Sequence, residues 1–233
     1  MDLLPFLLDE NPYVTNPHAI PRWWMRQTIT PPQLPAVVKN YLKLSEQNNK
    51  SVSIAPGVVI DESAGAVTIG AGSKICHGAV IQGPVVIGAD CIIGNYAFIR
   101  PGCLIGNQVR IGYGTEIKNA VLESTTTIGP QCFISDSVIG KGAYLGAQVR
   151  TSNHRLDGKT VHVRLDDEDI DTGCEKLGCY IGPGARLGVQ VIILPGRYIA
   201  AESTIGPRIT IEQNLPKGKY ILKQEISCLV GEE

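Results

Sequence analysis

The chain has 233 residues and a formal net charge of −1, from 21 Lys and Arg against 22 Asp and Glu. This length suits one large domain or two small ones, and the charge balance excludes a dedicated nucleic-acid-binding protein, which normally has a basic excess. The apolar runs are shorter than the roughly 20 residues of a membrane helix, and MDLLPFLLDE lacks the basic start of a secretory signal. The seven cysteines form no CxxC pair, so we expect reduced thiols in a cytoplasmic protein.

Residues 1–50 form the first segment and contain seven prolines and the pair Trp23–Trp24. A short helix is predicted to begin near Pro35, because proline is tolerated in a first turn, and to run through Leu42. We expect this segment to pack on the first coil of the repeat that follows and to shield its open end.

A hexad repeat follows and dominates the chain. A large aliphatic residue recurs every sixth position from Ile69 to Ile117, and the phase resumes after two five-residue steps. The residue after the aliphatic is often glycine, and the residue four positions after it is small. The later members of the series are Leu122, Ile128, Ile134, Ile139, Leu145, Ile181, Leu187, Ile193, Ile199, Ile205 and Ile211.

A period of six matches neither a helix nor a plain alternating strand. It indicates a triangular coil of three short faces, eighteen residues in total, with aliphatic and small residues inward and glycine at corners where φ is positive. We therefore predict an all-β parallel β-helix of about seven coils over residues 51–213. A polar loop at 150–179 interrupts the coils, and residues 214–233 are predicted to form a C-terminal extension that closes the far end.

The hexads resemble those of the hexapeptide-repeat acyltransferases, whose β-helix is left-handed. The similarity is strongest to the acetyltransferase half of bifunctional sugar-1-phosphate nucleotidylyltransferases, at IRPG (99–102), IGYGTEIKNAVL (111–122), SDSVIGKGAYLGAQVRTSNHRLDGKTV (135–161) and EKLGCYIGPGARLGVQVIILPG (175–196). The resemblance implies a homotrimer in nucleotide-sugar metabolism that acetylates glucosamine-1-phosphate from acetyl-CoA. The nucleotidylyltransferase half has no counterpart here, because there is no glycine-rich GxGTR-type loop.

The resemblance also implies the acceptor site. Arg100 and Lys118 match basic residues that bind the sugar phosphate, and Asn153 matches the asparagine that positions the amino sugar. A fixed guanidinium and an ammonium suit a phosphate dianion. The alternative is that Arg100 and Lys118 are outward charges on a solvated β-face.

The catalytic position departs from the family pattern. The general-base histidine of the family falls on Pro130, its tyrosine on Phe133, and its asparagine of the next coil on Tyr144. Because proline cannot accept a proton from an amine, simple transfer of the family activity is doubtful.

His154 is the second candidate base. It lies in TSNHRLD, which resembles the loop of hexapeptide O-acetyltransferases whose histidine is the base. Imidazole suits proton removal from an attacking hydroxyl or amine, and Asp157 is expected to orient the ring. The alternative is a surface histidine without a role.

The resemblance places the pantetheine of acetyl-CoA along the late coils, between two prisms. The matching small residues are Gly188, Val189, Ala200 and Ala201, although Ala200 and Ala201 also fit a packing role at a corner. The cations expected to bind the phosphates of CoA are Arg197, Arg208, Lys217 and Lys219.

A metal site is not predicted. Zinc needs three converging ligands, and only His154 and His162 share a loop. The acidic run at 166–169 lacks the spacing of a calcium loop, and the cysteines are predicted to pack as small apolar side chains.

The sequence thus leaves three hypotheses. The first is a CoA-dependent acyltransferase for a sugar or sugar phosphate. The second is an inactive scaffold that retains the prism. The third is a sugar-phosphate-binding protein that partners a separate nucleotidylyltransferase.

Overall fold

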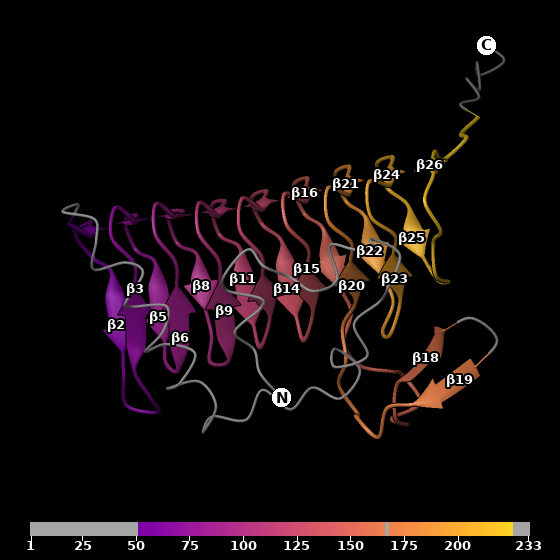
Figure 1. Cartoon of the computed structure of the whole chain (residues 1–233), viewed down its shortest axis with the longest axis horizontal. Coiled ribbons are helices and arrows are strands. Elements are labelled where there is room, and N and C mark those ends of the chain that lie inside the picture. Colours follow the sequence, from indigo (N-terminus) through magenta and orange to yellow (C-terminus); the bar gives the residue numbers. More distant parts are fainter. Residues whose placement is uncertain (1–50, 166–167, 226–233) are drawn as a thin grey trace, which may run out of the picture.

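The computed structural model describes residues 51–165 and 168–225, and all regular structure in this part of the chain is β. Three parallel sheets wind into one prism, and a two-stranded hairpin projects near its C-terminal end (Figure 1). This is the parallel β-helix that the hexads predict; its left hand stays a prediction. No helix in the described residues is long and apolar enough to cross a membrane.

The first sheet contains nine strands. They are β1 (Ser53–Ile54), β4 (Lys74–Ile75), β7 (Ile92–Ile93), β10 (Arg110–Ile111), β13 (Thr127–Ile128), β16 (Tyr144–Leu145), β21 (Arg186–Leu187), β24 (Thr204–Ile205) and β26 (Lys219–Tyr220).

The second sheet contains eight strands. They are β2 (Val59–Asp61), β5 (Val80–Gln82), β8 (Phe98–Ile99), β11 (Glu116–Lys118), β14 (Phe133–Ser135), β17 (Arg150–Thr151), β22 (Ile192–Ile193) and β25 (Thr210–Ile211).

The third sheet contains seven strands. They are β3 (Val67–Ile69), β6 (Val85–Ile87), β9 (Cys103–Ile105), β12 (Val121–Leu122), β15 (Val138–Ile139), β20 (Tyr180–Ile181) and β23 (Tyr198–Ile199). We call the turn from the first to the second sheet the first edge, that from the second to the third the second edge, and that from the third to the first the third edge.

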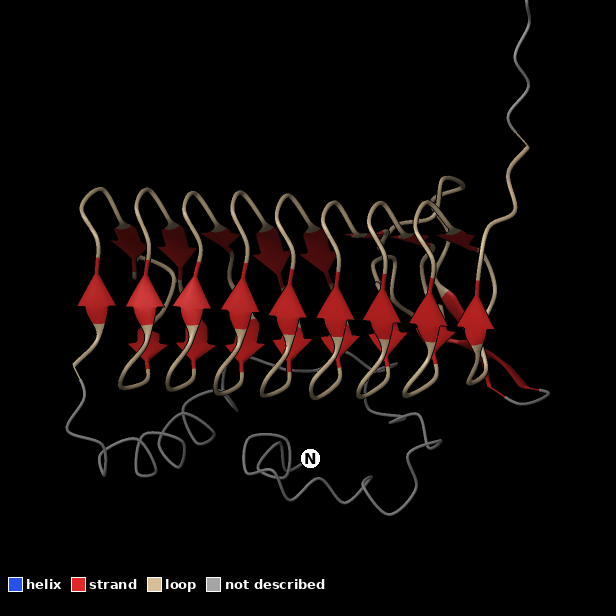
Figure 2. Cartoon of the chain, turned by 90° about the horizontal axis from the view of Figure 1, so that it is seen from above, coloured by secondary structure: helices blue, strands red, loops and turns tan. Residues whose placement is uncertain are grey.

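The register follows the repeat. Ile99 pairs with Ile81 in the preceding coil and with Ile117 in the next, so identical positions stack at intervals of eighteen residues. Ile117 then pairs with Ile134, because the five-residue step shortens that coil to seventeen residues without breaking the stack. The strands of each sheet therefore lie in parallel rows along the prism (Figure 2).

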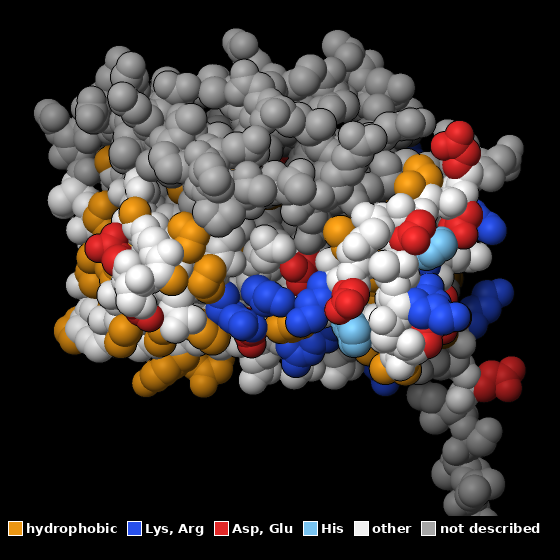
Figure 3. Space-filling model, turned by 90° about the horizontal axis from the view of Figure 1, so that it is seen from below, with side chains coloured by type: hydrophobic (Ala, Val, Ile, Leu, Met, Phe, Trp, Pro, Cys, Tyr) orange, Lys and Arg blue, Asp and Glu red, His pale blue; other side chains and the backbone are white. Residues whose placement is uncertain are grey.

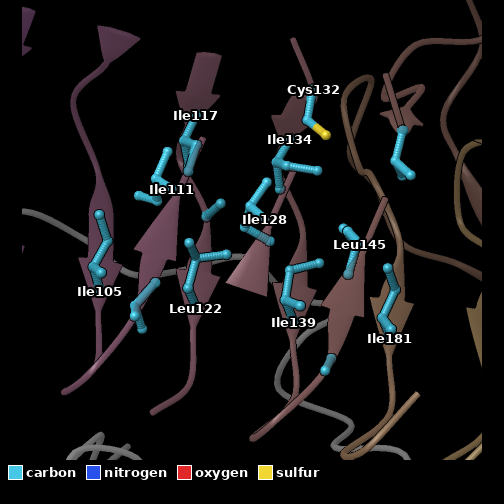
Figure 4. Packing of buried hydrophobic residues seen from close by; sticks show 14 of the residues in the cluster. Ile105, Ile111, Ile117, Leu122, Ile128, Cys132, Ile134, Ile139, Leu145 and Ile181 are labelled. Carbon is cyan, nitrogen blue, oxygen red and sulfur yellow. The ribbon is translucent and has the colours of Figure 1, made fainter. Parts of the chain in front are cut away.

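The core is a stack of the predicted hexad residues. Of the nine isoleucines between Ile69 and Ile117, all but the half-buried Ile69 are buried, and the later aliphatic positions are buried as well. The small positions from Ser73 to Thr115 are also buried. Figure 4 shows how these side chains fill the prism from all three sheets. The assignment of core residues from the sequence is therefore confirmed.

The glycine that follows the aliphatic residue has a different role from the one predicted. Its φ is not positive; a Cβ on Gly94 would instead lie 2.6 Å from the carbonyl oxygen of Ile111, and one on Gly129 would lie 2.7 Å from the nitrogen of Ala147. The close approach of the next coil therefore excludes a side chain at these turns. Positive φ occurs two residues later, as at Tyr96 with φ 55°.

The C-terminal end of the solenoid extends beyond the predicted residue 213, because β26 pairs with β24. Strand pairing begins at Ser53, within the predicted bounds, and the solenoid has more coils than the seven predicted. Leu215 is buried and forms a bridge with Ile199, which places part of the predicted C-terminal extension in the prism. The predicted cap at 1–50, with its helix near Pro35, lies outside the described residues.

The predicted loop at 150–179 leaves the prism after β17 and returns at β20. Its outer part is an antiparallel hairpin of β18 (His162–Leu165) and β19 (Glu168–Asp171). Val161 and Val163 are buried while His162 between them is half-buried, as the alternation of a strand requires. The hairpin touches the prism at Gly196, where a Cβ would lie 2.5 Å from the carbonyl oxygen of His162. The loop is therefore packed against the second edge.

Candidate active site

The three predicted acceptor-binding residues lie along the second edge. Arg100 follows β8, Lys118 ends β11, and Asn153 follows β17 by two residues. The backbone N–H of Arg100 donates to the carbonyl of Ile117 at 2.8 Å, and the strand register then places Arg100 beside Lys118. The parallel stacking of coils thus brings together residues that are 18 and 35 positions apart.

Asp136 connects two of these residues, and sequence reasoning missed it. Its side chain is buried between coils, with 3% exposure. Oδ1 accepts a hydrogen bond from Asn119 at 2.7 Å, and Oδ2 accepts one from Ser135 at 2.7 Å and one from Asn153 at 2.5 Å. The ammonium of Lys118 lies 3.6 Å from the same Oδ2. A buried carboxylate requires such partners, so Asp136 orients both Lys118 and Asn153.

A signal for Asp136 was present in the sequence. It stands in the SDS tripeptide at a corner with φ 49°, a conformation that Asp and Asn tolerate better than most residues. A polar tripeptide between apolar strands indicates a buried polar cluster, but its partners come from neighbouring coils and are visible only in the fold.

Arg100 is also paired within the chain. Its Nη1 donates to Oε1 of Glu116 at 2.9 Å, and its guanidinium lies 5.8 Å from the centre of the Phe98 ring. Arg100 is half-buried rather than a fully solvated outward charge. An anionic ligand at this edge must therefore compete with Glu116 for Arg100 and with Asp136 for Lys118.

His154 lies just beyond this edge, on the loop that leaves the prism. The ring is exposed, and Nδ1 lies 3.2 Å from the carbonyl oxygen of Glu175. A carbonyl can only accept, so in the neutral ring Nδ1 carries the proton and Nε2 holds the lone pair that a general base needs. His154 also forms a backbone bridge with Lys176, which ties its position to the returning strand of the loop.

Asp157 does not orient His154 as predicted. It binds Arg155 through two hydrogen bonds, at 2.9 Å from Nε and 2.6 Å from Nη2. The guanidinium beside it holds the pKa of Asp157 well below its usual range. The planar fork of arginine matches a carboxylate better than imidazole does, which explains the preference.

A cavity of about 500 Å³ lies between the second edge and the loop residues 152–162 that lead into the hairpin; we call it the cavity beneath the hairpin. Its wall combines His154 and His162 from the loop with Leu194, Pro195 and Arg197 from the second edge. Nδ1 of His162 lies 3.1 Å from Oδ2 of Asp169 in the hairpin. On the face shown in Figure 3, a group of basic side chains lies next to a histidine. No group of three or more His, Cys, Asp or Glu residues in the described chain is arranged to hold a metal ion.

The comparisons with known proteins agree with this architecture. A sequence profile described as the GMPPB C-terminal domain matches residues 81–168. A protein named "Uncharacterized acetyltransferase YaiX" from Escherichia coli O6:K15:H31 is 65% identical over 97% of this chain and 98% of its own length. The chain belongs to the hexapeptide-repeat acetyltransferase superfamily.

More distant relatives are longer. The bifunctional protein GlmU of Methanococcus aeolicus is 33% identical over 74% of this chain, which spans 41% of that protein. The solved structure of the Francisella novicida UDP-N-acetylglucosamine acyltransferase matches 73% of this chain and 65% of its own, at 15% identity and a TM-score of 0.40.

Pro130, on which the family's base histidine is predicted to fall, lies on a different edge from His154. Pro130 is exposed at the first edge, and its carbonyl accepts the backbone N–H of Gln148 at 2.9 Å. Phe133 follows on β14 of the second sheet, and Tyr144 lies on the first sheet with the guanidinium of Arg186 at 5.3 Å from its ring. The width of the second sheet therefore separates Pro130 from His154.

Six of the eight residues predicted to bind CoA fall into two groups. Gly188, Val189 and Arg208 lie at the first edge. Ala200 and Ala201 lie at the third edge, where Lys217 is paired with Glu202. The strands of the first sheet separate the two groups within one chain. The other two residues belong to neither group. Lys219 is the first residue of β26 in the first sheet, and Arg197 lies at the second edge.

Sequence reasoning missed Arg150, which shares a hollow with Arg208. The hollow has a volume of about 480 Å³ and is also lined by Gln148, Gln190 and Ile192. The two glutamine side chains are joined by a hydrogen bond of 2.9 Å between coils. Two guanidinium groups beside two glutamine amides suit the phosphates of a ligand.

The buried cysteines pack as predicted. Cys91, Cys103 and Cys132 are at the small inward positions and all are buried. Burial raises the pKa of Cys91 to about 11 and that of Cys103 to about 12. These thiols stay protonated and unreactive at neutral pH.

Proposed function

We propose that this protein is a CoA-dependent acetyltransferase that acts on a sugar or sugar phosphate, with His154 as the general base. The observation that carries the proposal is the bond between Nδ1 of His154 and the Glu175 carbonyl, since it leaves Nε2 free beside a cavity. The similarity to named acetyltransferases along almost the whole chain supports the same class of reaction.

The chemistry is direct transfer. The hydroxyl or amine of the acceptor attacks the thioester carbonyl of acetyl-CoA, Nε2 of His154 takes the proton from the attacking group, and the CoA thiolate leaves. Asn153 precedes His154 in the chain, and its amide is held by Asp136 at the second edge, whereas His154 lines the cavity. Arg100 and Lys118 supply positive charge along the same edge for a sugar phosphate such as glucosamine-1-phosphate.

The donor is proposed to bind along the late coils. The hollow with Arg150 and Arg208 suits the phosphates of CoA. The small residues at the first and third edges could contact one CoA molecule only across the first sheet or between two copies of the chain. We therefore propose a cytoplasmic homotrimer with the donor between prisms; light scattering should give three times the 25.0 kDa of one chain.

The test uses two histidines of similar exposure. His154→Ala should reduce the release of CoA thiol, measured with a panel of amino sugars and sugar phosphates, by a factor of about 10² to 10⁴. His77→Ala should leave turnover unchanged, because His77 is exposed on an early coil at the first edge. Equal turnover of the two variants would remove His154 from the mechanism.

The alternative function is binding without catalysis. Pro130 favours it, since the position of the family base has no group that can take a proton. This hypothesis has two forms, an inactive scaffold and a sugar-phosphate-binding partner of a separate nucleotidylyltransferase. The partner form predicts calorimetric binding of glucosamine-1-phosphate without binding of acetyl-CoA.

A further inference from the structure

Arg197 differs from the other cations of the second edge. It lines the cavity beneath the hairpin, and its Nε is buried without a hydrogen-bond partner among the described residues. Arg100 and Lys118, by contrast, already bind Glu116 and Asp136. A buried guanidinium donor without a partner is unfavourable, so Arg197 is the group at this edge with most to gain from an anion.

The charges around the cavity support the same reading. Arg155 donates two hydrogen bonds to the carboxylate of Asp157, which balances its charge. His162 faces Asp169 and Asp171 at 3.1 and 3.9 Å. Arg197 has no ion pair of its own in the described part of the chain. Burial lowers the pKa of Arg197, and the positive charges of Arg155 and Arg164 lower it further. The negative charge of Asp169 acts in the opposite direction. Among the residues that the structure describes, Arg197 is therefore the guanidinium of this cavity without an ion-pair partner.

We propose that the cavity beneath the hairpin is a binding site for a phosphoryl group, held by Arg197. The guanidinium presents a planar set of donors that matches phosphate oxygens. Ser152 and His154 line the same cavity and add polar groups around the anion. This deepens the proposed function and rests on it, since Arg197 is among the cations expected to bind a phosphate of CoA. Because pyrophosphate binding at Arg197 needs neither acyl transfer nor a base at His154, the two proposals can fail separately.

The direct test is calorimetric titration of the full chain with inorganic pyrophosphate. Arg197→Gln should weaken binding at least tenfold, and Arg197→Lys, which keeps the charge but loses the fork, should lie between it and the unchanged protein. Arg110→Gln is the matched control, since Arg110 is exposed on the first sheet. It should change the affinity less than twofold. Equal binding by Arg197→Gln and the unchanged protein, or a tenfold loss in Arg100→Gln alone, would overturn the proposal.

A second pair of variants keeps the test valid if Arg197→Gln fails to fold. Leu156 lines the cavity and is fully exposed, so its replacement does not disturb the core. Leu156→Asp should weaken pyrophosphate binding several-fold through charge repulsion, while the neutral Leu156→Asn should not. The same affinity in both would contradict an anion at this cavity.

Competition identifies the source of the phosphoryl group. Displacement of pyrophosphate by glucosamine-1-phosphate but not by glucosamine assigns the site to the acceptor. Displacement by CoA but not by pantetheine assigns it to the donor. Displacement by neither would overturn a role for this site in binding the substrates of the proposed reaction.

Discussion

The Nδ2 of Asn153 donates to Oδ2 of Asp136, which lies one coil earlier in the prism. The same oxygen faces Lys118, so one buried carboxylate sets the positions of two candidate ligand-binding side chains. Asn153 is also where the chain leaves the prism for the hairpin loop, and Leu177 returns by donating its backbone N–H to the Asn153 carbonyl at 2.9 Å. The Asp136 contact thus links the solvent-facing edge to the cavity that contains His154.

Replacement of Asp136 by Asn should therefore affect both stability and binding. The variant loses the negative charge opposite Lys118. Its new amide group also turns an N–H donor toward one of the side chains that now donate to Asp136, which should lower the free energy of unfolding by about 1–3 kcal/mol. The dissociation constant for a sugar phosphate should rise several-fold. Urea unfolding and calorimetry measure the two effects. Glu212→Gln, an exposed change at the same edge, is the control and should alter neither.

The buried thiols predict a loss of stability at alkaline pH. Burial raises the pKa of Cys91 to about 11 and those of Cys103 and Cys179 to about 12, so these groups stay protonated in the folded chain after they ionise in the unfolded chain. The contribution of these thiols to the free energy of unfolding is complete below about pH 9. It declines as the pH rises toward their pKa values in the folded chain.

The measurement for this prediction is the slope of unfolding free energy against pH between about 9.5 and 11. Each thiol contributes a decline of roughly 1.4 kcal/mol per pH unit. Cys103→Ala removes one such group and should make the slope shallower by that amount, whatever its cost at pH 7. Parallel slopes for the variant and the unchanged protein would contradict the assignment.

Replacing glycine by alanine should destabilise the protein by different amounts at different turns. Gly94→Ala places a Cβ 2.6 Å from the carbonyl oxygen of Ile111, which forces neighbouring coils apart. We expect a loss of about 2–4 kcal/mol, comparable with other overpacking and strain effects in cores. Gly158→Ala is the control, because φ there is +68° but no atom lies within 4 Å of the added carbon. It should cost about 1 kcal/mol, and thermal unfolding compares the two.

Arg208→Ala tests the donor hollow. Loss of a charge-assisted contact should raise the dissociation constant of acetyl-CoA about tenfold or more, measured by calorimetry. Arg110→Ala should not change it. An equal effect of Lys217→Ala would indicate that the donor contacts the first and third edges together, as the proposed trimer requires. Unchanged binding in Arg208→Ala would place the donor elsewhere.

Much of the fold could be predicted from the hexads alone. A strict period of six leaves one inward aliphatic per face, and burial of Ile75 through Ile117 follows directly from that spacing. The sequence was less informative about the turns. From its place after Ile93, Gly94 is predicted to be a corner residue with positive φ. What excludes a side chain there is instead the short distance to the next coil, and the sequence of a single coil carries no information about that distance.

The site divides in the same way. The sequence alone determined the repeating core, the three sheets and the identity of the side chains that occupy the second edge, because the repeat assigns every residue an inward or outward position. Only the tertiary structure decided their partners: Asp136 for Asn153, Arg155 for Asp157, and, within residues 51–165 and 168–225, none for Nε of Arg197. Hydrogen bonds and ion pairs depend on sub-ångström placement of groups from different coils, and the path of the loop sets that placement for residues 152–178.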